Sequence, residues 1–137
     1  MNNPITKPAL TVSLKKPSIR IYKETLHLIG NPEYVLLSVN FADNTLVITP
    51  SITFDAKAHN VGKYLKNSSK SVVLYSTPLI RSLQQMSGDW QTDKAYRIYG
   101  QLALDKKCVQ FKLADAISMS SFVSILTNSR ADESLTK

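Results

Sequence analysis

The residues of this chain best suited to chemistry are basic side chains gathered around one short, strand-like stretch. Arg20 lies between Ile19 and Ile21, and this alternation predicts a half-buried strand with the guanidinium directed outward. Two lysines precede the strand and one follows it, namely Lys15, Lys16 and Lys23. Cations held on one face neutralise phosphates and release counterions, so the pattern indicates a surface for nucleic acid.

A second basic stretch lies in the middle of the chain. It contains four lysines, Lys57, Lys63, Lys66 and Lys70, and no acidic residue occurs between Asp55 and Asp89. We expect residues 51–70 to be a connector that crosses the surface. Lys63, Lys66 and Lys70 either extend the nucleic-acid footprint or belong to a plain solvated linker, and the sequence leaves both interpretations open.

Catalysis has little support in the sequence. There is no Gly-rich phosphate loop and no HExxH or CxxC motif, and His27 and His59 lack a partner spacing that suggests a metal or a triad. The single cysteine, Cys108, excludes an internal disulfide and alternates with apolar residues as a core or edge residue does. The aspartates in predicted turns fit backbone capping: Asp43, Asp89, Asp93 and Asp105. We therefore expect no enzyme, metal or cofactor.

Charge and composition indicate an acidic partner. The 137 residues include 17 basic and 10 acidic ones, for a net charge of +7, and 43% are hydrophobic. This length and composition predict one globular domain, and a small basic domain usually meets nucleic acid, an anionic surface or an acidic protein. No apolar run approaches the roughly 18 residues of a membrane span, and the N-terminus lacks a signal-peptide pattern. We expect a cytoplasmic protein without a membrane partner.

The elements that would position the basic residues occur twice, about 53 residues apart. Each copy reads strand, helix, strand, strand: 18–22, 23–29, 34–39 and 45–49, then 71–75, 77–86, 96–104 and 108–113. At the start of the copies, Ser18 matches Ser71 and Tyr22 matches Tyr75. A supersecondary unit that cannot bury its apolar face alone needs a second copy. The repeat therefore predicts a single α+β domain built from duplicated β-α-β-β units.

The predicted organisation follows from the repeat. Repeat 1 covers about 9–50 and includes an extra strand at 9–14, the connector covers 51–70, and repeat 2 covers about 71–113. Gly30 and Gly88 stand where helix-ending glycines belong. A C-terminal helix is expected from Asp115 to about Leu126, within a tail of 114–137. Both copies should share one core: Ile19, Ile21, Leu26, Val35 and Val39 against Val72, Leu74, Leu79 and Ile98.

The first copy resembles the AbrB-type swapped-hairpin DNA-binding family. That family has a strand, a basic turn, an I-x-I-P-K-E-x-R passage into a short helix that ends at glycine, and a hairpin. The residues that fit are Ile19, Ile21, Lys23, Glu24 and Gly30, together with the hairpin that follows. Three positions depart from the pattern: Tyr22 replaces proline, Pro17-Ser18 replaces Gly-Arg or Gly-Gln, and Thr25 or His27 falls where arginine is usual. The likeness covers about 42 residues well and residues 71–113 weakly.

The resemblance implies a fold and a function. Such modules dimerise by interleaving hairpins into one barrel, and a tandem-repeat, MraZ-like chain would build that swapped-hairpin barrel internally as a pseudo-dimer. It implies a transcriptional regulator that lays a basic strand-turn face on double-stranded DNA. By position this face carries Lys15, Lys16, Arg20 and Lys23. The chain is expected as a monomer or a homodimer.

Two other functions fit the composition. One is a protein-binding or inhibitory accessory module of a phage or mobile element, with an acidic protein as its partner. The other is a small-molecule or nucleotide binder that uses a cleft between the repeats. Tyr22 and Tyr75 have two interpretations as well, because they either hydrogen-bond phosphate or pack at the strand ends, and we favour packing.

Overall fold

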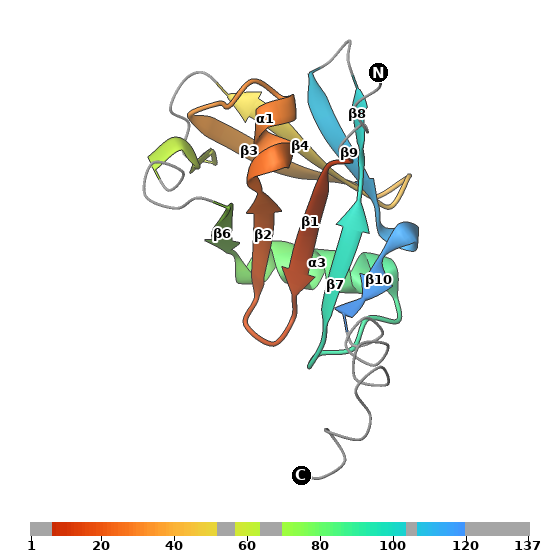
Figure 1. The fold of residues 1–137 in the computed structure, drawn as a ribbon. Helices are drawn as coiled ribbons and strands as arrows, with labels where there is room; N and C mark the ends of the chain where they lie inside the picture. The colour runs from red at the N-terminus through yellow and green to blue at the C-terminus, as the bar shows by residue number, and fades with distance from the viewer. Residues whose placement is uncertain (1–6, 52–56, 64–69, 104–106, 120–137) are drawn as a thin grey trace, which may run out of the picture.

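The strands of this chain form two five-stranded sheets in the computed structural model, which describes residues 7–51, 57–63, 70–103 and 107–119 (Figure 1). The first sheet has the order β10-β7-β1-β2-β6, with bounds Ile117–Ser118, Ala95–Tyr99, Ala9–Ser13, Ser18–Tyr22 and Ser71–Tyr75. The second has the order β5-β3-β4-β9-β8, with bounds His59–Asn60, Tyr34–Asn40, Thr45–Ser51, Cys108–Lys112 and Gln101–Ala103. All pairings are antiparallel. With helices α1 (Lys23–Leu28) and α3 (Thr77–Ser87), the described part is α+β, as predicted.

Both helices end within one residue of the prediction, α1 at Leu28 instead of Ile29 and α3 at Ser87 instead of Met86. α1 is followed by Gly30 at φ +89°, and α3 is followed by Gly88 at φ +83°, a backbone conformation that glycine adopts without a Cβ penalty. α3 starts with Ser76, whose Oγ accepts a hydrogen bond from the Leu79 N–H at 3.4 Å. Pro78 lies in the first turn, where its missing N–H costs nothing.

One core joins the two copies. Seven of the residues expected to meet there are buried in a single cluster, and Val39 and Leu79 pack against it as partly buried side chains. The buried ones are Ile19, Ile21, Leu26, Val35, Val72, Leu74 and Ile98. The prediction of a shared core is confirmed.

The two copies pair with each other in both sheets, and the β2–β6 pair has a local two-fold relation. In the first sheet β2 pairs with β6 so that Arg20, the middle residue of β2, lies opposite Val73, the middle residue of β6. In the second sheet β4 pairs with β9, with Val47 opposite Gln110. Two backbone hydrogen bonds at the ends of the β2–β6 pair repeat the symmetry, Lys23 N–H to Lys70 O at 2.9 Å and Ser76 N–H to Pro17 O at 3.3 Å. Positions related by the 53-residue repeat therefore face each other in the first sheet, and the second sheet joins β4 of one copy to β9 of the other.

The second hairpin differs from its prediction. A continuous strand over 96–104 was expected to pair with 108–113, but the chain changes sheets at Gly100. β7 pairs with β1 in the first sheet, and of the segment 96–104 only β8 pairs with β9 in the second sheet. Gly100 permits this crossing because a Cβ there would lie 2.5 Å from the Gln110 carbonyl oxygen and 2.7 Å from the Phe111 ring. The predicted turn at 105–107 lies largely outside the described residues.

Replacing Gly100 should destabilise the fold. In Gly100→Ala the new methyl group would overlap backbone as well as the buried Phe111 ring, so we expect a loss of about 1–3 kcal/mol in the free energy of unfolding. Urea denaturation measures this loss. The neighbouring exposed change Gln101→Ala is the control and should stay within about 0.5 kcal/mol of the wild type. An unchanged urea midpoint for Gly100→Ala would show that the strands do not cross this closely.

The prediction of a C-terminal helix that starts at Asp115 is wrong for residues 115–118. Leu113–Asp115 form a 3-10 turn, and Ile117–Ser118 form β10, which pairs with β7. Leu113 is buried, and its N–H donates to the Asn44 carbonyl at 3.0 Å, so tertiary contacts fix the chain before a helix can start. Residues 120–126 of the predicted helix lie outside the described part. The described strands form two sheets and no closed barrel.

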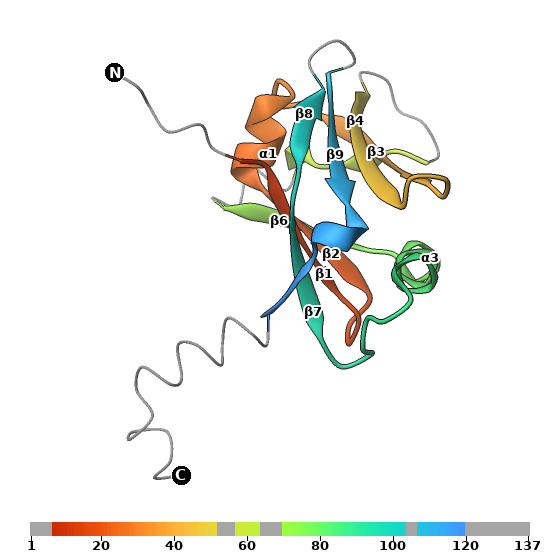
Figure 2. The same cartoon turned by 90° about the vertical axis from the view of Figure 1, so that its right-hand side faces the viewer.

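Helix α3 covers one face of the first sheet. It places Ile80 and Leu83 in the core, and Figure 2 shows it on one side of β1, β2 and β7. No described helix lies over the middle of the opposite side (Figures 1 and 2). We call that side the outer face. Along its strands, buried core positions alternate with the side chains that this face presents.

Candidate nucleic-acid interface

The outer face carries cations and tyrosines and no acid on its strands. Its side chains come from β1, β2, β6, β7 and β10, at positions that alternate with the core. They are Thr11, Ser13, Arg20, Tyr22, Ser71, Val73, Tyr75, Arg97, Tyr99 and Ile117. A positively charged face without carboxylates attracts polyanions and does not neutralise itself internally.

The structure spreads the predicted basic residues along the β1–β2 hairpin, from its turn to the start of α1. Arg20 is exposed in the middle of β2, and its NH1 donates to the Ser71 Oγ at 2.6 Å. Lys15 and Lys16 are exposed in the β1–β2 turn, beyond one end of the strand. Lys23 is exposed at the other end, where α1 begins. The outward direction of Arg20 is as predicted, because Ile19 and Ile21 beside it are buried.

The connector lysines separate in the structure. Lys70 immediately precedes β6, and its carbonyl accepts the Lys23 N–H at 2.9 Å, so it joins the Lys23 end of the outer face. Lys63 follows β5, a strand of the second sheet, and its N–H donates to Asn60 Oδ1 at 2.9 Å. Lys66 lies outside the described residues. The structure therefore brings Lys70, and not Lys63, to the strands of Arg20.

Sequence reasoning missed Arg97. This residue lies on β7 and belongs to the same cross-strand row as Arg20, because Thr11 of β1 is the partner of both. The signal was present, since Arg97 stands between Tyr96 and Ile98, both buried, as Arg20 stands between two isoleucines. It was overlooked because β7 was expected to pair with β9 and not with β1.

The tyrosines of the outer face have different environments. Tyr22 is half-buried, and its hydroxyl lies 2.9 Å from Thr11 Oγ1 and accepts from Arg97 NH2 at 2.9 Å. It packs as predicted and also hydrogen-bonds. Tyr75 is 71% exposed and Tyr99 is 38% exposed, so neither is enclosed by the strand ends. These two rings are accessible to a partner.

The cysteine and the two histidines, which are residue types common in catalysis, are partly or fully buried or contact a neighbouring side chain. Cys108 is buried, and Nδ1 of His27 lies 3.1 Å from the Asn31 side-chain amide. Burial lowers the pKa of His59 below its ordinary value, so His59 is neutral near pH 7. Among the described residues, no three His, Cys, Asp or Glu side chains gather as metal ligands would. No helix in the described ranges is long and apolar enough to cross a membrane.

Comparison of the chain with protein-family models, with curated proteins and with solved structures found no match.

Proposed function

We propose that this protein is a non-enzymatic, cytoplasmic regulator that binds double-stranded DNA through the outer face of the first sheet and the β1–β2 turn. The observation that carries the proposal is the outer face, whose strands present no acid and on which Arg20 and Arg97 share one row while Lys15 and Lys16 extend beyond the strands. The resemblance of the first copy to AbrB-type modules supports it. In that view the two copies act as one swapped-hairpin pseudo-dimer within a single chain.

The size of the sheet indicates how the duplex would lie. Strands are spaced about 4.8 Å apart, so five strands span roughly 20 Å, whereas the major groove is about 12 Å wide. The whole face is too broad to enter the groove and would lie across the phosphates. A two-stranded ribbon fits the groove, so the β1–β2 turn with Lys15 and Lys16 is the part that enters it.

A binding titration of the full chain with a labelled duplex tests the proposal. The affinity should fall steeply as salt rises, with a log–log slope of about 0.9 for each neutralised phosphate. No binding at low salt would reject the proposal.

One observation favours an acidic protein as the alternative partner. Ile117 is 37% exposed and Val73 is half-buried on the same face, and apolar side chains among arginines and tyrosines are typical of protein interfaces. Binding of an acidic protein with no affinity for DNA would select this second function.

Replacing the connector lysines should show whether this segment is a binding surface or a linker. Replacing Lys63, Lys66 and Lys70 by Gln should leave the melting temperature nearly unchanged, because Lys63 and Lys70 are exposed and exposed lysines contribute little to stability. If the connector extends the footprint, duplex affinity falls and the salt slope decreases by up to about 0.9 per contact. Because Lys70 alone lies beside the Arg20 strands, Lys70→Gln should account for more of that decrease than Lys63→Gln. Unchanged affinity of the triple variant would make the segment a plain linker.

A further inference from the structure

Arg97 is held in a fixed position on the outer face. Its guanidinium carbon lies 5.2 Å from the centroid of the Tyr22 ring, and its NH2 donates to the Tyr22 hydroxyl at 2.9 Å. That hydroxyl is anchored in turn by Thr11 Oγ1 at 2.9 Å, and Arg97 also hydrogen-bonds the side chain of Tyr99. An arginine fixed by an aromatic face and two hydroxyls loses little conformational freedom when it binds a ligand.

The same guanidinium keeps unused binding capacity. Its Nε is buried and makes no hydrogen bond with any described residue, although arginine has five N–H donors. No carboxylate pairs with it in the described part of the chain. Burial by itself would lower the pKa of Arg97, but the contacts with Tyr22 and Tyr99 outweigh burial and raise the pKa, so the charge is permanent. A partly buried, permanent charge without a counterion is stabilised by an anion.

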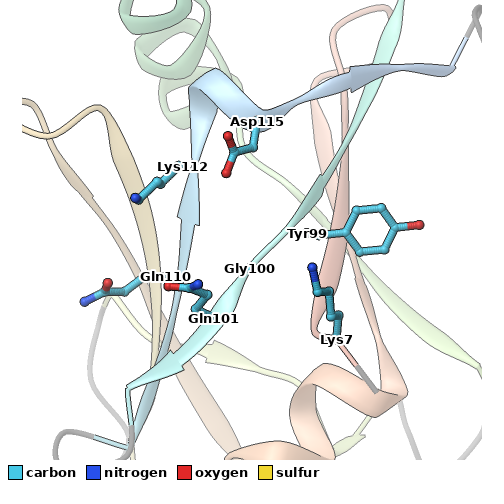
Figure 3. Close-up of a pocket in the computed structure, with 7 residues that line it drawn as sticks. All are labelled: Lys7, Tyr99, Gly100, Gln101, Gln110, Lys112 and Asp115. Carbon is cyan, nitrogen blue, oxygen red and sulfur yellow. The ribbon is translucent and has the colours of Figure 1, made fainter. Parts of the chain in front are cut away.

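One cleft adjoins this charge, and a second cleft, which Arg97 does not line, shares Lys7 with it. The first, of about 280 Å³, is lined by Arg97, Tyr22, Lys7 and Glu24 among others. The second, of about 260 Å³, runs along β8 and β9 and is drawn in Figure 3, with Lys7, Tyr99, Lys112 and Asp115 around it. Lys7 lines both clefts. Three cations and two acids therefore surround the pair of clefts, a net positive lining.

The start of β1 positions Lys7 at this junction. The Ala9 N–H donates to Thr25 Oγ1 at 2.9 Å, and the Thr25 hydroxyl donates back to the Ala9 carbonyl at 2.9 Å. Thr25 is fully buried, so this pair of hydrogen bonds ties Ala9, two residues after Lys7, to helix α1. Lys7 thus approaches the clefts from a fixed anchor.

We propose that Arg97 and Lys7, with the hydroxyl groups of Tyr22 and Tyr99, form a phosphate-binding site on the outer face. A planar guanidinium matches two oxygens of a phosphate, and an ammonium group adds a point charge beside it. The inference deepens the proposed function, because the DNA backbone is one source of phosphate groups. A free phosphate or a nucleoside monophosphate is the other source, and the site chemistry is common to both.

Titration of the full, ¹⁵N-labelled chain with inorganic phosphate tests the site without DNA. At constant ionic strength we expect a saturable shift of the Arg97 Nε–H signal and of the backbone amides of Tyr22 and Tyr99, with chloride as the control anion. The backbone-amide shifts of Tyr22 and Tyr99 should disappear in Arg97→Gln and persist in the matched variant Arg81→Gln, which changes an exposed arginine of α3 on the opposite side of the sheet. If Arg97→Gln does not fold, Lys7→Gln takes its place and should weaken phosphate binding several-fold. No saturable shift at Arg97, or an equal shift in Arg97→Gln, overturns the proposal.

A second arm identifies the source of the phosphate. The same signals are followed with deoxyadenosine monophosphate and with a short duplex. If the duplex is the natural ligand, Arg97→Gln lowers duplex affinity and decreases the salt slope by about 0.9. If the monophosphate shifts Arg97 while duplex affinity is unaffected by Arg97→Gln, the site serves free phosphates. A phosphate shift in a protein with no duplex affinity at all supports this site while rejecting the DNA-binding function.

Discussion

A fragment that ends at residue 60 is expected to be unfolded or aggregated. The cut removes β6 and β9, the strands that pair with β2 and β4. It also removes the second half of the shared core, which includes Val72, Ile80, Leu83, Ile98, Val109 and Phe111. Burying one such side chain contributes about 1.5–3 kcal/mol, so the six together contribute about 9–18 kcal/mol, which is comparable with the whole stability of an ordinary domain, about 5–15 kcal/mol.

Circular dichroism and thermal melting of the fragment measure this outcome. The matched control is complementation, in which separately produced 61–137 is added to 1–60. Mixing should restore a cooperative melting transition, because both central strand pairs form between the two halves. A 1–60 fragment that is soluble, monomeric and cooperatively folded would show that the first copy has a core of its own.

Reversing two charges should produce the largest change in DNA binding. In the double variant Lys16→Glu, Arg20→Glu, two attractions to phosphate become repulsions. One pair of unit charges 4 Å apart in water contributes about 1 kcal/mol. Because each reversal turns such an attraction into a repulsion, duplex affinity should fall by about tenfold or more. The log–log salt slope should also decrease by about 1.8, for two lost contacts. Fluorescence anisotropy at several salt concentrations measures both quantities.

The fold should not change in this variant. Lys16 and Arg20 are exposed, so their replacement removes no core contact, and the melting temperature should stay close to that of the wild type. Duplex affinity and salt slope that are indifferent to both reversals would place the DNA contact elsewhere on the molecule, if DNA is bound at all.

The first copy was predicted from the sequence with little error because its signals are local. Alternation around Arg20 and the glycine after α1 each act within a few residues, and β2 has the bounds that were expected. The 53-residue repeat also predicted the contact between copies, since Ile19 and Leu74 are direct cross-strand partners. The local pattern and the internal repeat were therefore enough to predict the core residues.

The errors arose where tertiary contacts decide the outcome. The sequence 96–104 is strand-like throughout, but the strand pairings show that the chain changes sheets at Gly100, where it passes close to the Gln110 carbonyl. Ile117 fits a helical spacing, yet its register with Arg97 makes it a strand residue. The same change of sheet brings Arg97 into the row of Arg20, so the site residue that was missed depended on the pairing that was missed.

The most direct test of the outer face as a DNA surface compares two reversals of equal charge. Arg20→Glu changes the outer face, whereas Arg81→Glu changes an exposed residue of α3, the helix on the opposite side of the first sheet (Figure 2). Both variants lower the net charge by the same amount, so a general electrostatic effect weakens duplex binding equally in the two. Our account predicts that Arg20→Glu reduces duplex affinity and the salt slope while Arg81→Glu leaves the salt slope unchanged. Equal losses in the two variants, or a larger loss in Arg81→Glu, would contradict it.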